Sequence, residues 1–158
     1  VLRSAYMLGN GEEVMLAATD LLAETKVAPE LSNEAHYYRA KAYLDAGKVE
    51  GAMDDLKILA KDTRNIYGAE AKYKVAQIYF DAGQTEQAEK EVLDYIEVST
   101  PHTYWLARSF VLLSDVYMKL GRNLDAKQYL LSLKQNYQAD DDIAGMIESR
   151  LNKLNAEN

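Results

Sequence analysis

The stretch of sequence that decides the fold occurs three times, and the copies align without a gap. It reads Asn33-Glu-Ala-His-Tyr-Tyr-Arg-Ala-Lys-Ala-Tyr-Leu-Asp-Ala-Gly47, then Ala69-Glu-Ala-Lys-Tyr-Lys-Val-Ala-Gln-Ile-Tyr-Phe-Asp-Ala-Gly83, then Ala107-Arg-Ser-Phe-Val-Leu-Leu-Ser-Asp-Val-Tyr-Met-Lys-Leu-Gly121. The closing glycines are 36 and 38 residues apart. A period between about 20 and 50 residues indicates a protein built from stacked copies of one supersecondary unit.

The residues that recur predict a pair of antiparallel helices in each copy. The glycines are expected where one helix stops and the chain reverses, because a left-handed backbone is nearly free only for glycine. Small residues are expected where two helices cross closely: Ala40, Ala76 and Ser114 on the first helices, and Ala52, Ala88 and Ala126 on the second. The remaining recurrent positions are predicted to face inward: Tyr43, Tyr79 and Tyr117, followed by Leu56, Val92 and Leu130.

The composition agrees with an all-α fold and excludes several functions. The 158 residues include only 2 Pro and 8 Gly, and apolar residues recur at helical spacing almost throughout. The formal net charge of −7, from 25 acidic and 18 basic residues, argues against nucleic-acid binding. There is no cysteine for disulfides or thiolate metal sites. No apolar stretch approaches the roughly 20 residues of a membrane-spanning helix.

Over roughly residues 31 to 137 these features resemble the tetratricopeptide repeat family. The resemblance implies a right-handed solenoid of antiparallel helix pairs, a superhelix without catalytic activity. The chain departs from the family pattern at the usual Trp position, which holds His36, Lys72 or Phe110, and at Arg39, where Leu is common. A narrower likeness, in the run Ala71-Lys-Tyr-Lys-Val-Ala-Gln-Ile-Tyr79, is to bacterial envelope proteins such as outer-membrane assembly lipoproteins and the TolA-binding type. This favours the periplasm or cell envelope over the cytoplasm.

We predict a single domain over residues 1–158, with three full repeats between two incomplete ends. Val1 to Leu8 reads as the tail of a helix, which suggests a fragment or a processed chain. Ala17 and Leu21 have the spacing of Ala52 and Leu56. Thr100 is expected to cap a helix that begins at Pro101. The segments are 1–30 (truncated repeat), 31–65 (repeat), 66–100 (repeat), 101–138 (repeat with an extended first helix) and 139–158 (capping helix). The capping helix is predicted to have one apolar stripe, formed by Ile143, Met146, Ile147, Leu151 and Leu154.

No constellation of residues predicts an enzyme, a metal site or a cofactor. His36 lies at a helix-packing position and His102 in a first turn, and neither has metal-ligand spacing. Asp140-Asp-Asp142 is read as acids in the first turn of the last helix, where they complement the helix dipole. Asp54-Asp55 is read as a solvated outer face.

In the architecture that the resemblance implies, first helices line a concave groove. Helical spacing then selects positions that mix apolar anchors with charged groups, as suits an extended peptide or a helix of a partner. They are Tyr37, Lys41, Leu44, Tyr73, Gln77, Phe80, Val111, Asp115 and Met118. Alternatively, some of them pack in the core. The Lys and Asn residues with which some family members grip a terminal carboxylate are absent from these positions.

The sequence therefore predicts a protein–protein interaction scaffold that binds a protein or peptide partner and no nucleic acid. One alternative is a structural module that self-associates, for instance as a homodimer, or that acts as a spacer in a longer solenoid. Another is a recruiting region for an enzyme encoded upstream.

Overall fold

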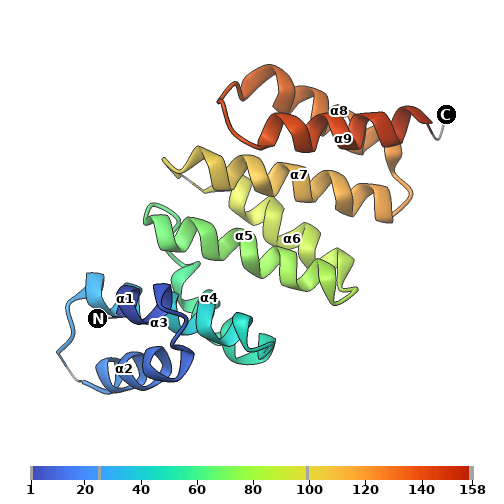
Figure 1. The fold of residues 1–158 in the computed structure, drawn as a ribbon. Coiled ribbons are helices and arrows are strands. Elements are labelled where there is room, and N and C mark those ends of the chain that lie inside the picture. The colour runs from blue at the N-terminus through green and yellow to red at the C-terminus, as the bar shows by residue number, and fades with distance from the viewer. Residues whose placement is uncertain (1, 25, 99, 157–158) are drawn as a thin grey trace. The chain divides into compact units, whose positions relative to one another are not determined.

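The computed structural model describes residues 2–24, 26–98 and 100–156, and within these ranges the regular structure is entirely helical (Figure 1). The helices are α1 (Leu2–Met7), α2 (Gly11–Ala23), α3 (Pro29–Asp45), α4 (Val49–Leu59), α5 (Ile66–Asp81), α6 (Thr85–Glu97), α7 (Thr103–Lys119), α8 (Asn123–Asn136) and α9 (Ile143–Ala156). The chain divides into two compact units, Val1–Val75 (unit 1) and Ala76–Asn158 (unit 2), which we describe separately. The division falls within α5.

Unit 1 is built around α3. This helix packs against α2 on one side and α4 on the other, and α1 contacts both α2 and α3. Apolar residues of α1, α2 and α3 form the core between them: Leu2, Ala5, Val14, Ala18, Ala35, Tyr38 and Ala42. The helical periodicity of these residues thus fixes three helices around one apolar cluster.

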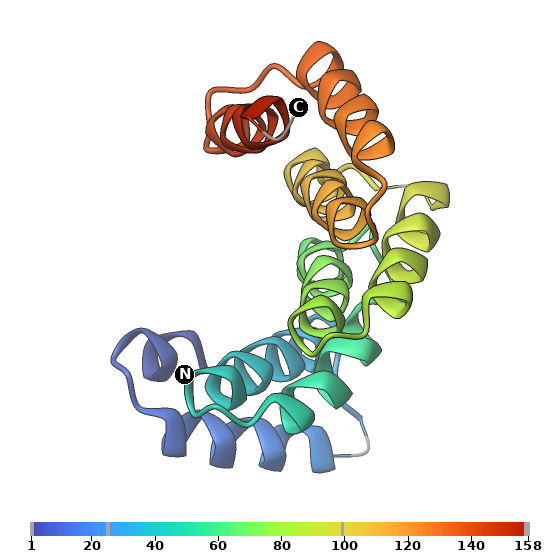
Figure 2. The ribbon, with the colours of Figure 1, turned by 90° about the vertical axis from the view of Figure 1, so that its right-hand side faces the viewer.

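Unit 2 is built around α7 in the same way. This helix packs against α6, α8 and α9, and α8 also contacts α9, as the view in Figure 2 shows for the C-terminal helices. Eight residues of α7 are buried, which reflects its central position: Ala107, Ser109, Val111, Leu112, Leu113, Ser114, Val116 and Tyr117.

The turn between the helices of a pair has the predicted left-handed glycine. At Gly47, where φ is +74°, the glycine N–H donates to the Leu44 carbonyl and the Lys48 N–H donates to the Tyr43 carbonyl, at 3.0 and 2.8 Å. The Lys48 carbonyl then accepts the first bond of α4, from the Ala52 N–H at 3.2 Å. The same three bonds recur around Gly83 and Gly121, so these predicted turns are confirmed.

A fourth turn of the same kind occurs at Gly9, and it corrects the predicted register of α2. Gly9 has φ +74° and lies 38 residues before Gly47, with the same bonding pattern. Counting from this glycine, Val14 and Ala18 occupy the positions of Ala52 and Leu56, and both have no exposed surface. The prediction from Ala17 and Leu21 was wrong by three residues, because a spacing of four fits both pairs and only the turn decides between them.

The small residues lie at the helix crossings, as predicted. Ala40, Ala76 and Ser114 are at most 1% exposed, and the three alanines of the second helices have no exposed surface. The Ser114 hydroxyl donates to the Val111 carbonyl at 2.6 Å, so its polar atom has a partner inside its own helix. A larger side chain at any of these positions has no room.

Two predicted helix starts are shifted. α7 begins at Thr103 and not at Pro101, because the Thr100 hydroxyl accepts the His102 N–H at 3.1 Å and forms a turn before the helix. Tyr104 lies within α7, as predicted.

The C-terminal acids also precede their helix. α9 begins at Ile143, and the Asp141 carboxylate accepts the Ile143 N–H at 2.9 Å. The predicted stripe of α9 is confirmed for its four buried residues, Ile143, Ile147, Leu151 and Leu154, whereas Met146 is half-buried.

Candidate functional site

The predicted binding positions fall into two groups, one in each unit. Unit 1 contains Tyr37, Lys41 and Leu44 of α3 and Tyr73 of α5. Unit 2 contains Gln77 and Phe80 of α5 and Val111, Asp115 and Met118 of α7. The surroundings of the two groups differ.

In unit 1, Tyr37 and Lys41 converge on the buried carboxylate of Glu70. The Tyr37 hydroxyl donates to both Glu70 oxygens, at 3.0 and 3.2 Å. The ammonium groups of Lys74 and Lys41 lie 2.8 and 3.5 Å from Glu70 Oε2. Glu70 is only 8% exposed, so these donors replace the water that its carboxylate loses on folding.

The ring of Tyr37 is also held on both sides. It packs against the rings of Tyr38 and Tyr67, whose centroids lie 5.1 and 4.4 Å from that of Tyr37. The Lys41 ammonium lies 4.9 Å from the centroid of the Tyr37 ring. Burial and then the charge of Glu70 raise the pKa of Tyr37, so the phenol stays a neutral donor. Burial and the neighbouring Lys74 lower the pKa of Lys41.

These contacts give the unit 1 positions a structural role in their own unit. Tyr37 and Lys41 are half-buried partners of Glu70, and Leu44 is half-buried. Tyr73 is 7% exposed and therefore lies in the interior instead of on an open surface. The helical spacing that selected Tyr73 also fits a residue that faces the core.

In unit 2, three of the predicted positions line one hollow. Phe80, Asp115 and Met118 surround it together with Lys119, Asn123 and Lys153. Its volume is about 430 Å³, within the range of about 300–1,000 Å³ of ligand pockets. We call it the α7–α9 hollow. The other two positions lie outside it: Gln77 donates to Asp81 at 2.8 Å, and Val111 is 3% exposed, so it packs inside the unit.

The charge of Asp115 is compensated by a residue of α9. Arg150 donates from Nε and Nη2 to the two carboxylate oxygens of Asp115, at 2.7 and 2.9 Å. Such a bidentate pair is among the stronger polar contacts in proteins. It links α9 to α7 beside the hollow, and both carboxylate oxygens of Asp115 accept hydrogen bonds from Arg150.

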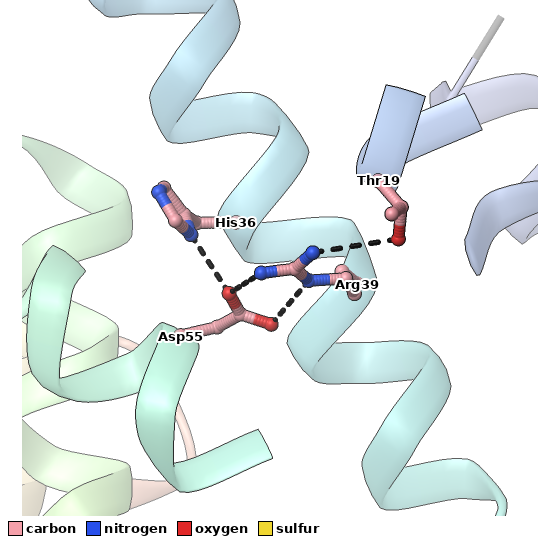
Figure 3. Close-up of polar contacts among 4 residues, drawn as sticks. All are labelled: Thr19, His36, Arg39 and Asp55. Carbon is pink, nitrogen blue, oxygen red and sulfur yellow. Dashed lines mark hydrogen bonds and ion pairs between the residues drawn. The ribbon is translucent and has the colours of Figure 1, made fainter. Parts of the chain in front are cut away.

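The most buried charge of unit 1 was read as solvated from the sequence, and that reading was wrong. Asp55 of α4 is 1% exposed. Its Oδ1 lies 2.7 Å from His36 Nδ1 and 2.6 Å from Arg39 Nη2, and its Oδ2 accepts from Arg39 Nε at 2.8 Å (Figure 3). Arg39 also reaches the Thr19 hydroxyl of α2, at 3.4 Å. The carboxylate therefore links α4 to α3, and the guanidinium extends this link to α2.

His36 has the structural role that its position predicted. Burial alone would raise the pKa of Asp55, but the hydrogen bonds and charges of Arg39 and His36 prevail and lower it. Two of the departures from the family pattern, His36 and Arg39, are thus explained by one buried acid on the next helix.

The lowered pKa of Asp55 predicts a loss of stability in acid. Its value in the unfolded chain is about 3.9, and the folded value is lower. The carboxylate therefore contributes stability above about pH 4, and this is lost as the pH falls through the folded value. Urea unfolding at a series of pH values should show the loss, and Asp55→Asn should weaken it, whereas Asp54→Asn at the exposed neighbour should not. An unchanged pH dependence in Asp55→Asn would contradict the assignment.

Within the described ranges, no three His, Asp or Glu side chains are grouped so that they could hold a metal ion. In the same part of the chain, no helix has the length and apolar character needed to cross a membrane.

Two segments of the chain match family models described as the tetratricopeptide repeat. One match covers residues 34–62, in α3 and α4, and the other residues 107–136, in α7 and α8. No curated protein matches the chain. A solved structure, titled "Crystal structure of MamA", is similar with a TM-score of 0.65 and 19% identity, over 99% of this chain and 96% of that one. At this identity the likeness concerns the fold. The predicted fold class, an all-α solenoid of helix pairs, is confirmed, and the two matches support its assignment to the tetratricopeptide repeat family.

Proposed function

We propose that the chain is a protein-interaction scaffold and that the α7–α9 hollow receives an apolar side chain from a peptide or helix of its partner. The single observation that carries this proposal is the convergence of Phe80, Asp115 and Met118 on one hollow of unit 2. The sequence predicts these residues as binding positions, and the hollow provides a concave surface for them.

The chemistry of the hollow supports a protein partner. Phe80 and Met118 are half-buried, so part of each apolar side chain remains available for contact. Aromatic residues and Met are enriched in the cores of protein interfaces, where a few anchors carry most of the binding energy. The charged residues around them would set the orientation of the partner. Tetratricopeptide repeats are in general interaction modules without catalytic activity, which agrees with this proposal.

The unit 1 positions belong to the proposal in a more limited way. Lys41 and Leu44 are half-buried and present part of their surface. Tyr37 is half-buried and would contact a partner only with the part of its surface that remains exposed. The narrower likeness to bacterial envelope proteins favours a partner in that compartment.

The proposal can be tested by affinity capture from a native lysate. The variant Phe80→Ala/Met118→Ala should lose a partner that the wild type retains, because both apolar contacts in the hollow are removed. Leu93→Ala/Leu131→Ala is the matched control, since it removes two exposed apolar side chains from α6 and α8. Circular dichroism would verify that all variants are folded.

A partner that both variants retain equally would contradict the proposed surface. Absence of any partner, with a mass that rises with concentration in light scattering, would favour self-association instead. Met7, Leu8 and Leu16, which are 73%, 84% and 68% exposed, are among the apolar side chains of unit 1 that could make such a contact.

A further inference from the structure

The α7–α9 hollow combines an apolar surface with two lysines for which the described residues supply no ion-pair partner. Lys119 of α7 and Lys153 of α9 both line it, and in the described part of the chain neither ammonium group forms an ion pair. The nearest acid along α7, Asp115, stands four residues before Lys119, a spacing at which the two could pair. Arg150 takes both of its oxygens instead.

The resulting charge of the hollow is opposite to that of the chain. Asp115 and Arg150 neutralise each other, which leaves the two ammonium groups as the net charge of the lining. The chain as a whole carries −7. An acidic partner would be repelled by most of the surface and attracted to this place, so the charge distribution selects both the site and the orientation of the partner.

We propose that the segment bound in the α7–α9 hollow carries an Asp or Glu side chain next to the apolar residue that contacts Phe80 and Met118. This rests on the proposed function and adds the chemical class of the partner. Lys119 and Lys153 are specificity residues in this arrangement, since they bind the acidic side chain from two different helices. Asn123, at the start of α8, adds an amide that can donate to the same carboxylate.

The test uses a library of short random peptides displayed on phage and fused to the coat protein at their C-termini. The displayed peptides then have no free terminal carboxylate, and Asp and Glu side chains are their only acidic groups. We expect selection on the whole chain to enrich peptides with Asp or Glu beside a large apolar residue. Synthetic copies should bind the wild type in fluorescence anisotropy, and more weakly as salt is added. Lys119→Gln/Lys153→Gln should weaken binding about tenfold or more.

Two control variants make the outcome specific. Lys61→Gln/Lys90→Gln removes the same charge at two exposed positions outside the hollow and should leave binding unchanged. Phe80→Ala/Met118→Ala tests the proposed function separately. Peptides that need Phe80 and Met118 but bind equally without the two lysines would overturn the inference and leave the proposed function standing.

Peptides that bind Lys119→Gln/Lys153→Gln and Phe80→Ala/Met118→Ala as tightly as the wild type would overturn both the inference and the proposed function. Enrichment of peptides without acidic residues, failure to enrich any, or an equal loss in the Lys61→Gln/Lys90→Gln control would also overturn the inference. In the last case the effect would come from the overall charge of the chain and not from the hollow.

Discussion

Replacing Gly68 with alanine is expected to destabilise unit 1 by about 3 kcal/mol or more, at the upper end of what overpacking costs. A Cβ atom at Gly68 would lie 1.9 Å from the Asp62 carbonyl oxygen and 2.6 Å from that of Leu59. Both atoms belong to the backbone, one at the last residue of α4 and one in the connection that follows, and the Leu59 carbonyl accepts the Asp62 N–H. They cannot move aside as a flexible side chain would, so α5 has to shift away from α4.

The change is measured as the free energy of unfolding in urea, followed by circular dichroism. Gly145→Ala in α9 is the matched control, because a Cβ atom there meets nothing within 4 Å. It should stabilise the chain by about 0.5–1 kcal/mol, the usual gain from replacing glycine within a helix. A loss of less than about 1 kcal/mol in Gly68→Ala would show that the two helices do not approach this closely.

The second large effect is expected for Asp55→Ala, which should cost about 2–4 kcal/mol. The substitution removes the acceptor of Arg39 and His36 in a place where the carboxylate is 1% exposed. Arg39 is 21% exposed and would recover only part of its hydration, so a poorly compensated charge would remain between α3 and α4.

Asp54→Ala provides the control, since Asp54 is the exposed neighbour on the same helix. Its effect on the free energy of unfolding should stay within about 0.5 kcal/mol. The double variant Asp55→Ala/Arg39→Leu removes acid and base together and should recover part of the loss, because no charge is then left unpaired. Equal losses in Asp54→Ala and Asp55→Ala would show that the carboxylate is not buried.

The turns and the helix crossings could be predicted because each depends on a residue type that few others can replace. A left-handed turn requires glycine, and a close crossing requires a small side chain, so three copies in phase were decisive. The register of α2 was missed although Gly9 carried the same signal. Its repeat has lost the other recurrent residues, with Ala5 at the position of the inward Tyr43.

The buried acid could not be recognised from residue type, because acids are ordinarily solvated. Its position held the better signal. Asp55 lies between Ala52 and Leu56 on the stripe that α4 buries, at a helical spacing that predicts a core position for any residue. Arg39 and His36 lie three residues apart on α3, and such a pair of donors facing a buried stripe indicates that it holds an acceptor.

The candidate site was predictable only where the spacing along a first helix determines exposure. Spacing placed Phe80 on the predicted face of α5 and Asp115 and Met118 on that of α7, and the structure brings the three together at one hollow. It could not show that Arg150 would take Asp115, because this contact joins residues 35 positions apart through the packing of α9. That tertiary contact takes from Lys119 the acid that stands four residues before it on α7.

The turns at Gly9, Gly47, Gly83 and Gly121 have a consequence for how the chain tolerates changes in length. In each, the residue after the glycine both closes the preceding helix and accepts the first bond of the next. One inserted residue would rotate the following helix by about 100° and take its small crossing residue out of the core. The connection over 137–142 carries no such double bond and residues 138–142 are mostly exposed, so an added label or tag belongs in this segment and not at the short turns.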